Sequence, residues 1–155
     1  RLSGRDSLLV EARAANASGD PARAELLYQR VLADHPDDYE AWVQLGEVQY
    51  HWGPLLGRAA GAAEPAFARA LALDPENVPA LTHLARLAAG DGRLARLDTI
   101  RRRLDVLAPG TDEAVEARVL AASLRETVAR AAAGRAPGTA AAAALPADAR
   151  DALRL

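Results

Sequence analysis

The sequence predicts an all-α fold in which antiparallel helix pairs stack into a solenoid, and three observations support this class. Residues that favour strands are scarce, because aromatic residues make up 4% of the 155 residues and isoleucine occurs once, at Ile100. Pro36, Pro75 and Pro109 each close an apolar segment, at separations of 39 residues (36 to 75) and 34 residues (75 to 109), and a period near 34 is typical of helical repeats. Within each period, leucine and alanine recur at the three- and four-residue spacing of a helix.

The first expected unit covers residues 1–38 and divides into two helices. The turn Ser18-Gly19-Asp20-Pro21 separates them, with Asp20 in the N-cap position and Pro21 in the first helical position. The second helix is expected to end before Pro36, because proline cannot continue a helix. The apolar positions of the two helices are Leu8, Leu9, Ala12, Ala15, Ala24, Leu27, Tyr28 and Val31.

The second expected unit, residues 39–77, repeats this order with an insertion near residues 51–61. Three apolar side chains in the insertion either pack back on the helices or contact a partner, and packing is favoured because buried aromatic residues are commoner than exposed anchors. These side chains are Trp52, Leu55 and Leu56. The apolar positions of the two helices include Trp42, Leu45, Gly46, Phe67, Ala70 and Leu71.

The third expected unit, residues 78–111, has its turn at Gly90-Asp91-Gly92. Residues 112–133 contain no glycine or proline and predict a single capping helix, since terminal units of repeat arrays are often atypical. Residues 134–155 are rich in alanine, proline and glycine and are expected to be a tail or the start of a further unit, with a short helix over 146–153. The apolar positions of the third unit are Leu81, Leu84, Ala85, Ala88, Leu94, Leu97, Ile100 and Leu104.

The second unit carries a recognisable family signature. Its Trp42-x-x-Leu45-Gly46, Ala63-x-x-x-Phe67-x-x-Ala70 and Pro75 resemble the tetratricopeptide repeat, although the signature tyrosine position holds Gln49, with Tyr50 beside it. The first and third units match in phase, so the resemblance covers roughly residues 5 to 125. We expect the largest side chains at signature positions to be buried: Tyr28, Trp42, Leu45, Phe67, Leu84 and Leu97.

The resemblance implies a right-handed superhelix whose first helices line a concave surface, and a non-catalytic module that binds a peptide or protein segment there. Polar residues of the first helices that the core does not require are the candidate partner-binding residues. They are Arg13, Asn16, Gln44, Glu47, His51, Thr82, His83 and Arg86. Because Arg13 and Arg86 lie on either side of Glu47 along the chain, we expect a ligand with acidic groups around a basic or amide centre.

Two further comparisons with the family narrow this expectation. Members that bind a C-terminal carboxylate use lysine and asparagine side chains, whereas this chain has no lysine and Leu9 stands at the first of those positions. The run from Glu40 to Glu47 and the insertion resemble the repeats of large bacterial signalling proteins, which join such repeats to serine/threonine kinase or transcription-activator domains. Because the chain begins with Arg1, we expect a piece of such a signalling or scaffold protein.

The sequence offers no motif for catalysis, a metal or a cofactor. Its three histidines, His35, His51 and His83, form no His-x-x-x-His pair, and no serine stands in a Gly-x-Ser-x-Gly setting. With no cysteine there is no thiolate chemistry. We therefore expect no enzyme, and we interpret the arginines around 101–103 as an ordinary solvated face.

Charge and hydropathy exclude other classes. The net charge of −2 argues against nucleic-acid binding, and no segment approaches the roughly 20 apolar residues that cross a bilayer. The sequence does not determine the compartment, although it favours a soluble, cytoplasmic protein. The alternative to a binding module is a self-assembling repeat protein, a dimer or filament stacked end to end through Leu2, Leu8 and Leu9 and the alanine-rich tail.

Overall fold

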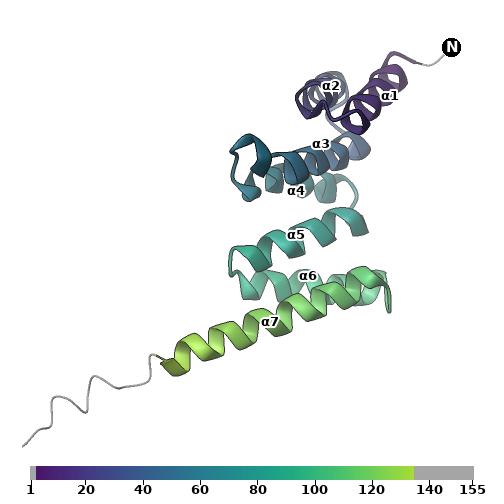
Figure 1. Cartoon of the computed structure of the whole chain (residues 1–155). Coiled ribbons are helices and arrows are strands. Elements are labelled where there is room, and N and C mark those ends of the chain that lie inside the picture. The colour runs from purple at the N-terminus through teal and green to yellow at the C-terminus, as the bar shows by residue number, and fades with distance from the viewer. Residues whose placement is uncertain (1–2, 135–155) are drawn as a thin grey trace, which may run out of the picture.

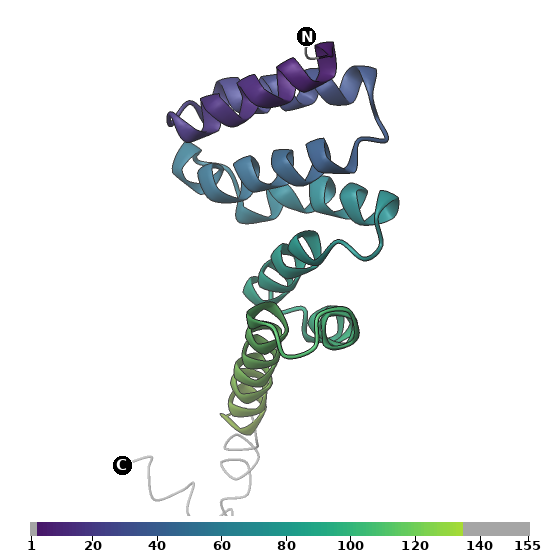
Figure 2. The same cartoon turned by 90° about the vertical axis from the view of Figure 1, so that its right-hand side faces the viewer.

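The computed structural model describes residues 3–134, and in that range it contains seven α-helices and no strand. The helices stack in chain order, with α1 and α2 at one end and α6 and α7 at the other (Figure 1). The view at right angles shows that the later pairs are turned relative to the earlier ones, so that the stack coils (Figure 2). The predicted all-α solenoid of helix pairs is therefore confirmed. The helices are α1 (Gly4–Ala17), α2 (Pro21–Asp34), α3 (Tyr39–Trp52), α4 (Glu64–Leu73), α5 (Val78–Gly90), α6 (Leu94–Leu107) and α7 (Asp112–Gly134).

Most helix starts follow from a capping side chain in the sequence. Ser3, Asp20, Asp38 and Asn77 each accept a hydrogen bond from the backbone N–H three residues later, which satisfies a donor that the first helical turn leaves free. The cap expected at Asp20 is therefore confirmed. The turns inside the first and third pairs each contain a glycine with positive φ, Gly19 at 79° and Gly92 at 70°, a conformation that costs other residues more.

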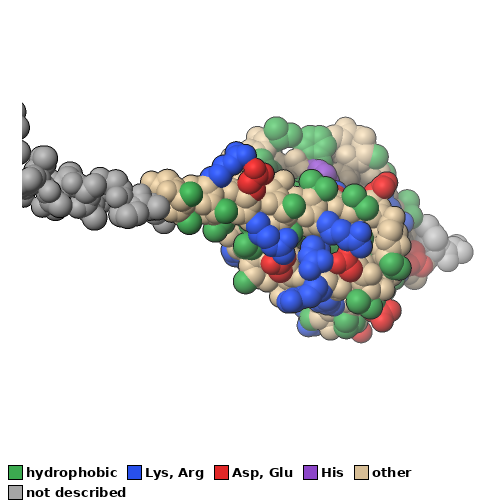
Figure 3. All heavy atoms as spheres, turned by 90° about the horizontal axis from the view of Figure 1, so that it is seen from below, with side chains coloured by type: hydrophobic (Ala, Val, Ile, Leu, Met, Phe, Trp, Pro, Cys, Tyr) green, Lys and Arg blue, Asp and Glu red, His purple; other side chains and the backbone are tan. Residues whose placement is uncertain are grey.

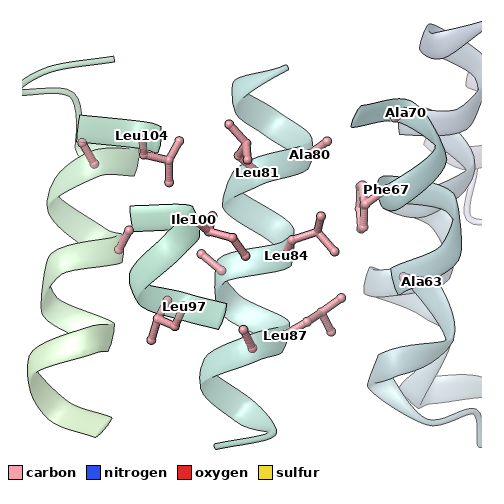
Figure 4. Packing of buried hydrophobic residues seen from close by; sticks show 14 of the residues in the cluster. Ala63, Phe67, Ala70, Ala80, Leu81, Leu84, Leu87, Leu97, Ile100 and Leu104 are labelled. Carbon is pink, nitrogen blue, oxygen red and sulfur yellow. The ribbon is translucent and has the colours of Figure 1, made fainter. Parts of the chain in front are cut away.

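Phe67 of α4 lies at the centre of the stack, where it contacts α3 and α5, and is fully buried (Figure 4). Gly46 makes its position possible, because a Cβ at residue 46 would lie 2.6 Å from the Phe67 ring. The glycine of the Leu45-Gly46 signature therefore lets α3 and α4 approach. Burial is also as predicted for four other large side chains, which are Tyr28, Leu45, Leu84 and Leu97.

Trp42 differs from the prediction, since it is half-buried rather than buried. Its ring packs against the core, while its indole N–H donates to the backbone carbonyl of Pro36 at 3.0 Å on the exposed side. The indole N–H needs a hydrogen-bond partner, and this partner draws one edge of the ring to the surface. The neighbouring Val43 and Val48 are buried instead.

The insertion between α3 and α4 folds into two short 3₁₀ turns, η1 (Pro54–Leu56) and η2 (Ala60–Ala63). Its three apolar side chains divide between the two alternatives. Trp52 packs against the core and donates its indole N–H to Asn16 at 3.0 Å, whereas Leu55 and Leu56 are 77% and 53% exposed. The packing prediction therefore holds for Trp52 and is wrong for the two leucines.

The helix α7 is a single long helix, as predicted, and uses alanines for its contact with α5 and α6. Ala114, Ala117 and Ala121 are buried, while Val115 and Val119 on its other side are exposed.

No described helix is both long enough and apolar enough to cross a membrane. The expected tail after residue 134, Leu2 and the short helix expected at 146–153 lie outside the described residues.

The contact between Gly46 and Phe67 predicts the effect of a single added methyl group. Gly46→Ala should destabilise the fold by about 1–3 kcal/mol, because its Cβ would overlap a ring that has no space to move into. Gly90→Ala is the matched control, since nothing lies within 4 Å of its Cβ position. Thermal unfolding would measure both. Equal melting temperatures for Gly46→Ala and the parent would show that α3 and α4 are not this close.

Asp38 predicts a change of stability with pH. Burial alone would raise the pKa of this carboxyl, but the Arg5 guanidinium at 2.6 Å and the backbone N–H of Ala41 hold it below its ordinary value of 3.8. The stabilisation is therefore complete above that value and is lost as the pH falls through the lowered pKa. Asp38→Ala should cost about 1–2 kcal/mol at neutral pH from the helix cap alone.

Asp38→Asn keeps a capping oxygen and loses the ion pair, so it separates the two contributions. Urea unfolding at several pH values should show a smaller loss than for Asp38→Ala, and a loss that shrinks in acid. A difference between the parent and Asp38→Asn that stays constant from neutral to strongly acid pH would contradict this assignment.

Candidate functional site

The first helices of successive pairs, α1, α3, α5 and α7, form one side of the stack, which we call the first-helix face. Polar side chains join each of these helices to the next. At the first junction, Trp52 also donates to Asn16, so that Asn16 is occupied by the fold. The ionic contacts along the face are Arg13 with Glu40, Glu47 with His83, and Arg86 with Glu116.

The predicted partner-binding residues differ in what they offer to a ligand. Arg13 and His51 are exposed, Gln44 and Glu47 are half-buried, and Arg86 is about one-third exposed. Thr82 is buried, and its hydroxyl donates to the Val78 carbonyl one turn earlier, so it has no free polar group for a partner.

Arg13 and Arg86 lie at different junctions and are each already paired with a carboxylate. Arg13 contacts Glu40, and Arg86 donates two hydrogen bonds of 2.7 Å to Glu116. The hydrogen bonds that Arg86 donates to Glu116, together with the negative charge of Glu116, raise the pKa of the Arg86 guanidinium. The two arginines that lie on either side of Glu47 along the chain are therefore occupied by carboxylates of the fold rather than free for a ligand.

Three of the predicted residues converge where α3 meets α5. The Glu47 carboxylate lies 2.7 Å from Nε2 of His83 and 3.2 Å from Nε2 of His51, with His51 one turn after Glu47 on α3. His83 is buried, and its ring stacks on Phe67 with centroids 4.6 Å apart and planes 2° apart. Burial raises the pKa of Glu47, but the hydrogen bond and charge of His83 and His51 outweigh it and lower the pKa.

A groove opens beside this cluster, between α3, α5 and α7, with a volume of about 810 Å³. Sequence reasoning missed most of its lining, because α7 was interpreted only as a cap. Leu120 and Leu124, which are half-buried on α7, were the available signal. The residues that line the groove are Tyr50, Arg86, Ala89, Gly90, Gly92, Glu116, Leu120, Ser123, Leu124 and Thr127.

Arg93, Arg96 and Arg101, in and just before α6, are paired with acidic side chains, as on an ordinary charged face. Arg102 and Arg103 instead donate to the Thr99 hydroxyl and to the Pro75 carbonyl. Arg101 contacts Asp98 and Asp105, and Arg93 and Arg96 both contact Glu64 of α4. The hydrogen bond from Arg93 is the main cause of the lowered pKa of Glu64. Figure 3 shows this end of the molecule, where arginine and acidic side chains lie side by side.

These features define a tetratricopeptide-type repeat protein: helix pairs stacked through a small residue and an aromatic ring, with a grooved first-helix face. The chain belongs to the family described as the Cilia and flagella-associated protein 70 middle TPR-like domain, which matches residues 8–149. The recognition made from the signature residues is thereby confirmed.

One curated relative is similar to this chain in sequence, and two solved structures are similar in fold. The chain is 33% identical over 96 residues to "Cellulose synthase operon protein C" of Xanthomonas axonopodis pv. citri (strain 306), which covers 62% of this chain. The chain spans only 6% of that protein's length.

The two solved structures are distant in sequence and similar in shape. The Yersinia enterocolitica type III secretion chaperone SycD, in complex with a peptide of the translocator YopD, superposes with a TM-score of 0.66 at 15% identity, covering 79% of this chain and 92% of that one. The TPR2B domain of yeast Sti1, in a complex with pHsp70, gives a TM-score of 0.62 at 17% identity, covering 79% and 97%.

Proposed function

We propose that this chain is a non-catalytic interaction module that binds a peptide or protein segment along the first-helix face, with the groove between α3, α5 and α7 as its main contact. The observation that carries the proposal is the groove itself, which combines apolar walls with hydroxyl and charged groups. Family membership supports the proposal, as do the complexes of the two similar structures, one with a peptide of YopD and one with pHsp70.

The groove lining favours a ligand of low charge. Tyr50, Ala89, Leu120 and Leu124 offer a surface for an apolar side chain, and burial of that side chain supplies the affinity. Arg86 and Glu116 neutralise each other at the edge of the groove, so neither attracts a strongly charged segment. We therefore replace the expected acidic ligand with an extended segment that carries one or two apolar anchors.

The setting of the module is a further part of the proposal. The chain's relative in a bacterium and the small share of that protein that it spans support a role within a larger bacterial scaffold or signalling protein. The repeats would then hold a partner while other domains act.

A pair of matched substitutions tests the groove. Peptides selected on the parent protein from a random display library would be measured against Leu124→Glu and against Val106→Glu, which adds the same charge to an exposed site on α6. Leu124→Glu should weaken binding tenfold or more, about 1.4 kcal/mol, because a buried carboxylate loses its hydration. Val106→Glu should leave the affinity unchanged. The reverse pattern would place the binding site on the second helices.

End-to-end assembly is the second candidate, favoured by one observation. Val115 and Val119 of α7 are 45% and 58% exposed on the side where a further helix pair would stack. At the other end, Leu9 is buried in its own unit and Leu8 is half-buried, so these leucines offer less surface than the sequence indicated. Light scattering of the parent and of Val119→Asp separates the two functions, since only an assembly through α7 changes mass with concentration and dissociates in the variant.

A further inference from the structure

We propose that Glu47, His51 and His83 form a binding site for a divalent transition-metal ion of the Zn²⁺ class, at the junction of α3 and α5. This inference goes beyond the proposed function and does not depend on it. It rests on three side chains, from two repeat units, whose donor atoms converge on one point of the first-helix face.

The spacing of the donor atoms fits an ion after small side-chain rotations. One donor atom from each of the three residues lies within 4.8 Å of the other two, and the Glu47 oxygens lie 2.7 Å and 3.2 Å from the two imidazole nitrogens. An ion bound at about 2.0–2.2 Å from each donor holds neighbouring donors roughly 3–3.5 Å apart in tetrahedral geometry. The ion would take the position between the carboxylate and the two rings that hydrogen bonds now bridge.

The donor set selects the class of metal. Two imidazole nitrogens suit zinc and its first-row neighbours, whereas Mg²⁺ and Ca²⁺ prefer a shell of oxygen ligands. Two histidines and one carboxylate are also a known zinc ligand set that leaves a fourth position open. The His51 side chain is 58% exposed, so water or a donor from outside reaches that position without rearrangement of the fold.

The fold holds two of the three ligands in place before any ion binds. His83 is 7% exposed in its side chain, stacks on Phe67 and meets the edge of Tyr50 with centroids 4.7 Å apart. Glu47 lies on α3 and is only 25% exposed. Arg86, one turn after His83 on α5, is paired with Glu116, so its positive charge opposes the ion less. Only His51 must be ordered, which lowers the entropic cost of binding.

One feature limits the affinity. Nδ1 of His83 is buried and has no hydrogen-bond partner. An ion on Nε2 displaces the hydrogen bond to Glu47 and requires the ring proton to be on Nδ1. Metal-binding histidines usually donate that proton to an acceptor whose loss weakens binding 10- to 100-fold. We therefore expect a micromolar site rather than a tight structural one. The fold forms its core without the ion, so metal removal should lower the melting temperature but not unfold the chain.

The test uses the untagged chain, with Co²⁺ as a spectroscopic probe and Zn²⁺ by calorimetry. The parent should bind one ion, and Co²⁺ should give the visible absorption of a four-coordinate site. His51→Ala and Glu47→Gln should each weaken binding tenfold or more. His35→Ala is the matched control, because it removes an exposed histidine outside the cluster and should bind as the parent does. We avoid substitutions of His83, whose ring is part of the core.

Thermal unfolding gives a second readout, because an ion that binds only the folded chain raises its melting temperature. Zn²⁺ should raise that of the parent and of His35→Ala, but not that of His51→Ala. No binding by the parent at about 1 mM ion would overturn the proposal. Equal affinity in the parent and His51→Ala, or a loss in His35→Ala, would equally assign the ion to other groups and leave the cluster as a hydrogen-bonded contact only.

Discussion

The close approach of α3 and α4 at Gly46 and Phe67 is the constraint on which the middle of the molecule depends. The ring fills the space that the missing side chain leaves, and its opposite surface then supports His83 of the next pair. One aromatic side chain thus sets a spacing within a pair and a position between pairs. The cluster at the α3–α5 junction exists because the core beneath it fixes one of its rings.

Polar contacts on the first-helix face follow the same organisation. Each junction between first helices carries an ionic contact, and each lies over an apolar core that sets the distance between the helices. The two arginine–glutamate pairs are one-third to one-half exposed, so they contribute little energy by themselves. Their role is to specify which side chains face one another, and so to decide which groups remain for a ligand. Arg86, for example, donates both of its hydrogen bonds on this face to Glu116.

The positions at which the helices begin and end could be predicted well from the sequence, because they depend on local signals. The cap at Asp20 and the ends before Pro36 and Pro75 lie within a few residues of the structure they determine. The candidate site could be predicted only as a set of separate positions. No local spacing shows that His83 faces Glu47, since that depends on the angle between units. Trp42 was misjudged for a related reason: its N–H partner, Pro36, belongs to the preceding connection.

The core itself divides at the second pair. One apolar cluster is formed mainly by α1, α2 and one side of α3, and the other mainly by α4, α5, α6 and α7. Only α3 and α4 contribute buried residues to both clusters, Val43 and Phe67 to one and Leu45 and Ala66 to the other. Damage to either end of the array therefore stays local, whereas damage to the middle pair reaches both halves. Local opening that begins at a terminal pair therefore leaves the other cluster packed, whereas opening of the central pair exposes both.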